Sequence, residues 1–338
     1  MFYYSTNKQS EKVNFREATI RGQAPDKGLY FPEVIPKLST TFLENLKSKS
    51  KADVAFEVIH PYVGGVINDE ELFEICRHTV SFDFPLVAIN QNISTLELFH
   101  GPTLAFKDVG AIFMSGCLGY FSKDNNKEVT VLVATSGDTG SAVANGFLGV
   151  EGVKVIILYP SGKVSKIQEL QLTTLGQNIT ALEVQGTFDD CQQMVKQAFT
   201  DKVVNEKLFL TSANSINVAR WLPQQFYYFY ALQQWQHNES PVICVPSGNF
   251  GNICAGILAA VSGLPTKHFV AACNSNDEFV KLKGKCIEVT TIDKANIKQL
   301  VNKWYLQNAK TKFHSIAQQL IEKFKKHKVT PSSIVIRE

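Results

Sequence analysis

Residues 129–146 read Val129-Thr-Val-Leu-Val-Ala-Thr-Ser-Gly-Asp-Thr-Gly-Ser-Ala-Val-Ala-Asn-Gly146. The first six residues are apolar or β-branched, as is typical of a buried strand. Two glycines then allow a tight turn, and the small residues that follow are compatible with a closely packed helix. The stretch therefore predicts a strand, a glycine turn and a helix in direct succession.

The same alternation continues along the chain. Amphipathic segments at 165–176 and 189–199 have helical periodicity and lie between short apolar runs. These runs, which we predict to be strands, cover residues 153–158, 179–184, 208–211, 242–245 and 269–272. Short buried strands that alternate with helices are typical of a parallel sheet with right-handed crossovers. We therefore predict an α/β fold.

The first 90 residues have a different pattern. They contain more charge, a Pro-Asp-Lys-Gly turn at 25–28, and two helical stretches near 39–50 and 69–78. We interpret residues 1–90 as a mostly helical N-terminal lobe. Residues 91–338 would then form the α/β region, which we expect to contain two interleaved sheet subdomains.

Composition narrows the class of protein. The net charge of +3 gives no reason to expect a nucleic-acid or membrane partner. No apolar run approaches the length of a membrane span, and the N-terminus lacks the pattern of a signal peptide. The seven cysteines are dispersed without a CxxC pair, which indicates reduced core thiols and no metal site. We expect a cytoplasmic protein, either a monomer or a small homo-oligomer.

Two glycine-rich loops share the pattern Ser-Gly-(Asp/Asn)-x-Gly, at 136–140 and 247–251. Each lies where a predicted strand ends and a helix begins, so backbone N–H groups and the helix dipole favour an anion there. Either loop alone is equally well explained as a tight turn with a helix cap. Two such loops in one region indicate two anionic groups, which we expect to share one crevice at the strand ends. Neither loop has the lysine of a nucleotide-binding P-loop, so a nucleotide-binding protein is the least favoured interpretation.

Lys107 lies at the start of a predicted helix, after Leu104, Ala105 and Phe106. Apolar neighbours partly desolvate an amine, which favours its uncharged, nucleophilic form, as Schiff-base chemistry requires. Composition alone favours the alternative, a lysine that extends into water from the helix start. The surrounding sequence is what distinguishes the two.

Read together, five segments resemble the threonine synthases, a family of fold-type II pyridoxal-phosphate enzymes. The resemblance covers about residues 1–275, and the twelve residues Glu97–Asp108 match the family's cofactor-lysine motif most specifically. The other matching segments are 24–33, 135–140, 212–217 with Arg220, and 245–251. The resemblance implies a fold of parallel sheets flanked by helices, with an N-terminal lobe.

The resemblance also implies an activity. The family's enzymes are carbon–oxygen lyases that act on phosphate, and they convert O-phospho-L-homoserine and water into L-threonine and phosphate. Lys107 would be the catalytic lysine that holds pyridoxal 5'-phosphate. The other implied cofactor contacts are Phe106, Ser247, Gly248, Asn249, Phe250 and Gly251. The implied substrate contacts are Thr135, Ser136, Gly137, Asp138, Thr139, Asn214, Ser215, Asn217 and Arg220.

Individual residues keep alternative interpretations. Arg220 is either a clamp for the leaving phosphate or a surface ion pair. Asp138 could instead cap the following helix, and His100 favours a positioning hydrogen bond over direct catalysis. Past residue 276 the family's pattern is no longer recognisable, so its pyridine-nitrogen partner has only Asn308 as a candidate here. The competing functions are a threonine dehydratase or other β-replacing enzyme of the same fold, and a catalytically impaired homologue.

Overall fold

The computed structural model describes residues 1–123, 128–273, 279–283 and 286–290. It divides the chain into two compact units. The first consists of Met1–Val245 and Asn249–Val270, and the second of Pro246–Gly248 and Ala271–Glu338. In the second unit β12 (Phe279–Lys283) and β13 (Cys286–Thr290) pair antiparallel, with Lys283 opposite Cys286.

The first unit contains a four-stranded parallel sheet with the order β8-β7-β6-β9. Its strands are β6 (Val129–Ala134), β7 (Val153–Pro160), β8 (Ile179–Val184) and β9 (Phe209–Thr211). In register, Val129 lies opposite Val153 on one side and Phe209 on the other. The prediction of a parallel sheet from alternating strands and helices is confirmed, and β6 and β8 have the bounds that the sequence indicated.

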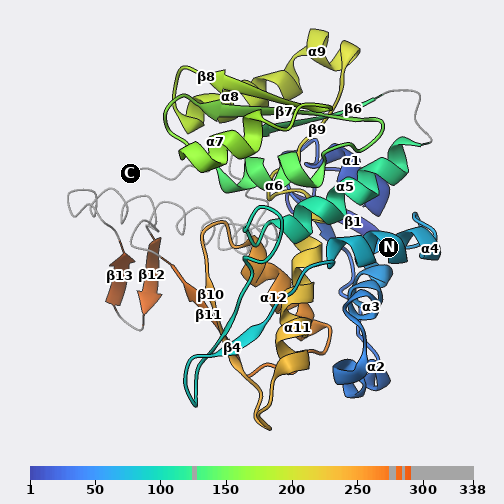
Figure 1. Cartoon of the computed structure of the whole chain (residues 1–338), viewed down its shortest axis with the longest axis vertical. Helices are drawn as coiled ribbons and strands as arrows, with labels where there is room; N and C mark the ends of the chain where they lie inside the picture. The colour runs from blue at the N-terminus through green and yellow to red at the C-terminus, as the bar shows by residue number, and fades with distance from the viewer. Residues whose placement is uncertain (124–127, 274–278, 284–285, 291–338) are drawn as a thin grey trace, which may run out of the picture. The chain divides into compact units, whose positions relative to one another are not determined.

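The two faces of this sheet pack against different helices. Val131 and Val133 belong to the main core, together with residues of α5 (Asp108–Ser122) and α6 (Asp138–Gly146). Leu132 and Ala134 belong to a second cluster formed with α8 (Phe188–Thr200) on the other face (Figure 1). Successive strand side chains point to opposite faces, and every residue of β6 is buried, so the strand is covered on both sides.

The remaining predicted strands, β10 (Val242–Pro246) and β11 (His268–Ala272), pair with each other in a separate two-stranded sheet. The helix expected after β10 is α12 (Gly251–Val261). The other helices of this half are α7 (Lys166–Thr173), α9 (Lys202–Lys207), α10 (Val218–Trp221), η2 (Leu222–Gln225) and α11 (Phe226–Gln234). Within the described residues, no helix has the length and apolar character needed to cross a membrane.

The N-terminal residues contain a small sheet that the sequence did not predict. Strands β1 (Phe2–Ser5), β2 (Val13–Asn14) and β3 (Tyr30–Pro32) pair antiparallel in the order β2-β1-β3. The helix α1 (Phe15–Arg21) follows β2, and a hairpin of β4 (Leu86–Ala88) and β5 (Ser94–Leu96) follows the helices of this region. Strands of two to four residues carry too little periodicity to be recognised.

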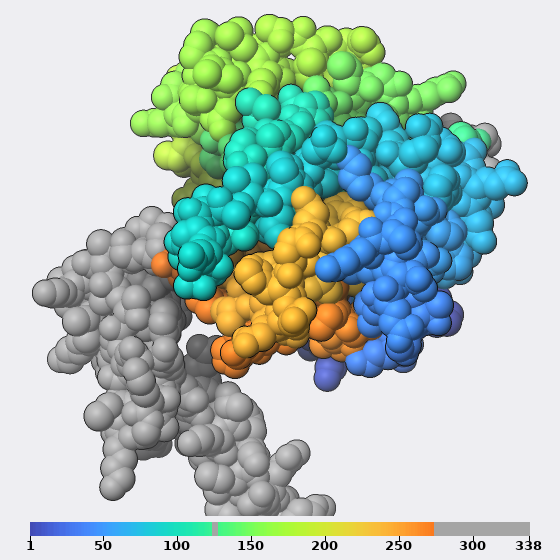
Figure 2. All heavy atoms as spheres, turned by 60° about the horizontal axis from the view of Figure 1, so that its bottom comes forward, coloured from blue at the N-terminus to red at the C-terminus, as the bar shows by residue number. Residues whose placement is uncertain are grey.

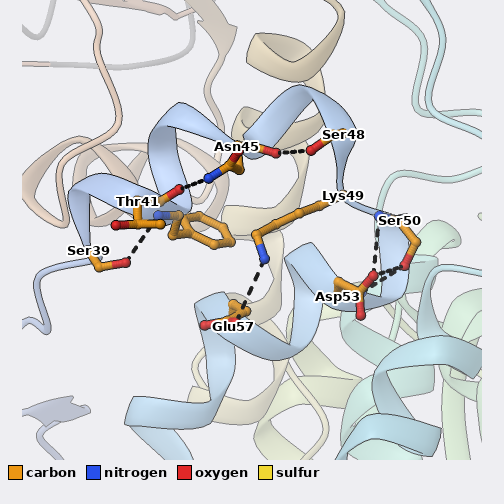
Figure 3. Close-up of polar contacts among 9 residues, drawn as sticks. Ser39, Thr41, Asn45, Ser48, Lys49, Ser50, Asp53 and Glu57 are labelled. Carbon is orange, nitrogen blue, oxygen red and sulfur yellow. Dashed lines mark hydrogen bonds and ion pairs between the residues drawn. The ribbon is translucent and has the colours of Figure 1, made fainter.

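The single helix expected at 39–50 is wrong. The segment forms α2 (Thr40–Glu44) and the 3-10 turn η1 (Leu46–Ser48), and α3 (Lys51–Val63) then begins. Each start has its own serine: the Ser39 hydroxyl accepts from the Phe42 N–H, and Ser50 forms a reciprocal capping box with Asp53 (Figure 3). Serine hydroxyls that bind nearby backbone groups favour helix starts over helix interiors, so Ser50 ends the predicted segment and starts a separate helix, α3, which the sequence did not predict.

Helix α3 packs against α11, and the two lie side by side on the face shown in Figure 2. The predicted helix at 69–78 is confirmed as α4 (Asp69–Thr79), which contacts both α3 and α5. The N-terminal helices thus hold the helix that begins next to Lys107.

Candidate active site

Lys107 occupies the N-cap position of α5 and is half-buried. Its Nζ donates a hydrogen bond of 3.1 Å to the Thr139 hydroxyl, at the start of α6. The Phe106 ring centroid lies 5.8 Å from the same nitrogen. The structure therefore brings together the cofactor-lysine motif and the first glycine-rich loop, which are far apart in sequence.

The surroundings of Lys107 change its basicity. Burial lowers the pKa of its ammonium group, the nearby Asp138 carboxylate opposes that effect, and the positive charge of Arg220 adds to it. A lysine whose pKa is lowered by desolvation keeps more of its amine in the uncharged, nucleophilic form. The alternative of a lysine extended into water does not fit a nitrogen that binds Thr139.

The Thr135 side chain, which the resemblance assigned to substrate contacts, binds backbone groups of the first glycine-rich loop. The buried Thr135 hydroxyl accepts from the N–H groups of Gly137 (3.0 Å) and Gly140 (2.8 Å) and donates to the Gly137 carbonyl (3.1 Å). Gly137 has a φ of +143°, which residues with a side chain rarely adopt. Among the described residues, no acceptor pairs with the N–H groups of Asp138 and Thr139. They remain available to an anion at the N-terminus of α6.

Asp138 does not cap α6, so that alternative is wrong. The N-cap is Gly137, and no side chain in the described part of the chain forms a cap hydrogen bond there. The Asp138 carboxylate instead accepts a 2.6 Å hydrogen bond from the carboxamide of Gln168, in α7. Sequence analysis missed Gln168, because it lies 30 residues away and nothing in its local pattern distinguishes it from a helix-surface glutamine.

Arg220 is only 3% exposed, so the surface ion pair considered from the sequence is wrong. One guanidinium nitrogen donates to the Ala213 carbonyl, and within the described residues no carboxylate lies within 4.0 Å. Burial lowers the pKa of Arg220 to about 10, so the side chain stays charged at neutral pH. Its Nε is buried and has no hydrogen-bond partner among the residues that the structure describes. A buried cation in this state is stabilised when an anion approaches it.

The residues beside Arg220 differ in how accessible they are. Asn217 is fully buried, and its amide nitrogen donates to the carbonyls of Thr19 (2.9 Å) and Ser212 (3.0 Å). Its side-chain oxygen accepts from the Ala219 N–H as the N-cap of α10. Asn217 therefore ties α10 to α1 and fixes the start of the helix that carries Arg220. The predicted neighbours Asn214 and Ser215 are half-buried.

The second glycine-rich loop crosses from one unit to the other. In the second unit the Ser247 N–H donates to the Ala272 carbonyl at 2.9 Å, and Gly248 is exposed. In the first unit Phe250 is the N-cap of α12 with a left-handed backbone, at φ +57°, between Asn249 and Gly251. The glycine turn and helix start were predicted correctly. That the two loops share one crevice stays a prediction.

His100 is paired with a carboxylate rather than with Lys107. Its Nε2 lies 2.7 Å from a Glu97 carboxylate oxygen, and its ring stacks on Phe99 with centroids 4.8 Å apart. This geometry agrees with a positioning role. The other candidate, Asn308, lies outside the described residues.

The fold and these side chains define a class: an α/β protein in which an amine of lowered basicity lies beside the start of α6 and near a buried cation, and in which the Asp138 and Thr139 N–H groups have no acceptor among the described residues. These groups fit a cofactor that carries a carbonyl for the amine and a phosphate for the backbone.

Comparison with known proteins is specific. The family described as "Pyridoxal-phosphate dependent enzyme" matches residues 87–324, and "Threonine synthase N terminus" matches residues 2–80. Threonine synthase of Buchnera aphidicola subsp. Baizongia pistaciae is 45% identical, over 82% of this chain and 65% of that protein. Threonine synthase of Escherichia coli K12 is 44% identical over the same shares. The crystal structure of yeast threonine synthase has a TM-score of 0.76 at 35% identity and covers 96% of this chain and 72% of the yeast chain.

The chain therefore belongs to the pyridoxal-phosphate dependent enzymes, and within them to the threonine synthase family. Pyridoxal phosphate is accordingly the cofactor of its class. The chain spans about 65% of the length of the bacterial relatives named above.

Proposed function

We propose that this chain acts as a threonine synthase, which converts O-phospho-L-homoserine and water into L-threonine and phosphate. Lys107 is the lysine that holds pyridoxal phosphate. The observation that supports the proposal is the 3.1 Å hydrogen bond between Lys107 Nζ and the Thr139 hydroxyl, which holds a half-buried amine at the start of α6. The relatives named above support the same activity.

The chemistry follows from the residue types. When bound, pyridoxal phosphate supplies the electron sink for bonds at the substrate's α-carbon, and the protein supplies orientation and proton transfer. Lys107 Nζ is the proton carrier, because burial lowers its pKa and an amine of lowered pKa gives up a proton more readily than an ordinary lysine. Thr139 holds that nitrogen at the start of α6.

The anionic groups of substrate and cofactor have separate binding sites in this proposal. The N–H groups of Asp138 and Thr139 bind the substrate's α-carboxylate, and Thr135 shapes the 136–139 loop through its bonds to the Gly137 and Gly140 N–H groups. Arg220 binds the leaving phosphate, because a guanidinium offers two parallel hydrogen bonds to phosphate oxygens. Asn214 and Ser215 border it, and Asn217 fixes its helix. The cofactor phosphate binds to the backbone of 247–251, and Phe106 packs near the ring.

We also propose the organisation of the chain and its cellular setting. Residues 1–90 form the N-terminal lobe and residues 91–338 the cofactor-binding region, close to the two matched family ranges. We place the protein in the cytoplasm as a monomer or small homo-oligomer. Cys76, Cys117, Cys191, Cys244 and Cys254 are free thiols, which agrees with a reducing compartment.

The proposal is tested by spectroscopy and product analysis on the purified chain. The visible absorbance of bound cofactor should disappear on borohydride reduction, and peptide mapping should locate the cofactor on Lys107. Phosphohomoserine should yield phosphate and threonine in equal amounts. A cofactor on another lysine would refute the assignment of Lys107.

The same experiment separates the alternatives. Release of a keto acid from serine or threonine, without phosphate release from phosphohomoserine, would identify a dehydratase. Cofactor absorbance without any turnover would identify an impaired homologue. Lys107→Ala serves as the control, since it should abolish both turnover and borohydride fixation.

A further inference from the structure

A buried tyrosine from a distant part of the chain binds the residue before Lys107. Tyr227, in α11, is 2% exposed, and its hydroxyl donates a hydrogen bond to the carbonyl of Phe106. That carbonyl belongs to the peptide group that joins Phe106 to Lys107. Because a peptide group is planar, fixing its oxygen also fixes the direction in which the Lys107 backbone continues.

A second set of bonds holds the residue on the other side of Lys107. The buried Asp108 carboxylate accepts from the Thr103 N–H at 3.0 Å and from the Thr103 hydroxyl. The Asp108 N–H donates to the Ala105 carbonyl at 3.0 Å. Lys107 is thus flanked by two anchored residues, one held from α11 and the other from the preceding turn.

The turn that these bonds close is strained. Leu104 has a φ of +59°, a left-handed conformation that a bulky side chain seldom adopts, and its side chain is 69% exposed. Because the Leu104 side chain is mostly exposed, apolar burial does not compensate for the strained backbone. Such conformations persist only where the surrounding contacts determine them, and they are concentrated at functional sites.

Tyr227 is suited to act as a permanent donor. Burial raises the pKa of its hydroxyl well above the ordinary value, so it keeps its proton throughout the working pH range. Its ring lies 5.6 Å from the Phe84 ring, which fixes the position of the hydroxyl. Among the hydrogen bonds of the described residues, the Tyr227 hydroxyl has Phe106 as its partner.

We propose that Tyr227 is a positioning residue for Lys107: its hydrogen bond to the Phe106 carbonyl holds the lysine in the orientation that proton transfer requires. The inference rests on the proposed function, since it assigns a partner to the lysine of that site. Loss of the bond lets the 106–107 peptide rotate, and a displacement of about 1 Å at a reacting group can lower a rate on the order of a hundredfold.

The same helix offers a matched control. Tyr230 is also buried, at 1% exposure, and its hydroxyl donates to the Lys51 carbonyl at 2.8 Å. Tyr227→Phe and Tyr230→Phe therefore each remove one buried tyrosine–carbonyl bond from α11, and both keep the ring. Both variants should lower the urea midpoint by similar amounts. They differ in which carbonyl loses its donor: Phe106, directly before Lys107, in one variant, and Lys51 in the other.

The experiment uses the full chain reconstituted with pyridoxal phosphate. For Tyr227→Phe we expect kcat to fall about tenfold to a hundredfold with little change in KM. We also expect the pH midpoint of the cofactor's visible absorbance to shift. Tyr230→Phe should match the wild type in both. Equal kcat and equal titration in the two variants, or parallel losses in both, would overturn the inference.

Two further measurements keep the outcome decisive. If Tyr227→Phe does not fold, Thr103→Val removes the hydroxyl anchor on the other side of Lys107. That variant should reproduce the loss of kcat and the shifted titration, and wild-type behaviour would overturn the inference. Borohydride mapping of the wild type tests the proposed function separately, because a cofactor on a different lysine refutes Lys107 itself, whatever Tyr227 does.

Discussion

Gly110, in the first turns of α5, gives the sharpest test of how the site is assembled. A Cβ added at this position would lie 2.3 Å from the carbonyl oxygen of Arg220 and 3.2 Å from its carbonyl carbon. Both are backbone atoms of α10, so no side chain can rotate away to make room. Gly110→Ala must therefore push apart the helix that begins at Lys107 and the helix that carries Arg220.

The expected size of the effect follows from two opposing contributions. Replacing glycine by alanine in a helix stabilises it by up to about 1 kcal/mol. An extra carbon forced into a packed interior costs about 1–3 kcal/mol, and the upper end applies where only backbone can move. We expect Gly110→Ala to lower the free energy of unfolding by about 2 kcal/mol, the difference between these contributions.

Gly119→Ala, in the same helix, is the matched control. Its added Cβ would lie 3.0 Å from a single methyl group, Cγ1 of Val150, which can shift. This variant should be neutral or more stable than the wild type by up to about 1 kcal/mol. Urea unfolding followed by circular dichroism gives both free energies, with an unchanged m value as a check on two-state behaviour. Equal stabilities for the two variants would refute the reasoning.

Three other predictions concern charge and capping. Because burial lowers the pKa of Lys107, its ammonium form destabilises the folded, cofactor-free chain at neutral pH, and the cost disappears as pH rises past the ordinary value of 10.5. Lys107→Met should therefore raise the urea midpoint at pH 7 by an amount that shrinks towards pH 10; a pH-independent gain would contradict this. Burial raises the pKa of Asp26, but hydrogen bonds to its carboxylate outweigh that effect and lower the pKa from 3.8 to about 2. The stability that the carboxylate provides is present above its ordinary pKa and lost towards about pH 2, so wild type and Asp26→Asn should converge in urea unfolding as the pH falls through that window. Ser50→Ala removes the capping box of α3 and should cost about 1 kcal/mol in thermal or urea unfolding, whereas the exposed Ser48→Ala should be near neutral.

The local sequence determined most of the α/β elements. Every residue of Val129–Ala134 is apolar or β-branched, and the segment is a strand buried on both faces. The glycines of 136–140 predicted the turn and helix start that the structure has, with Gly137 in a conformation suited to glycine. These predictions succeed because strand burial and glycine turns depend on neighbouring residues. The prediction of one helix at 39–50 was wrong because serines can either start a helix or lie within one. The local sequence does not distinguish these two cases.

The twelve residues around Lys107 determined which lysine to consider, and the family comparisons agree with the resemblance they carry. The sequence could not determine the surroundings of that lysine. Arg220 lies in a segment compatible with a surface helix, yet it is buried, and Gln168 reaches Asp138 from another helix. Tyr227 binds the Phe106 carbonyl across 121 residues. Periodicity tells which face of an element is buried, whereas the packing of the whole chain decides which side chains meet there, and therefore the charge and orientation of the lysine.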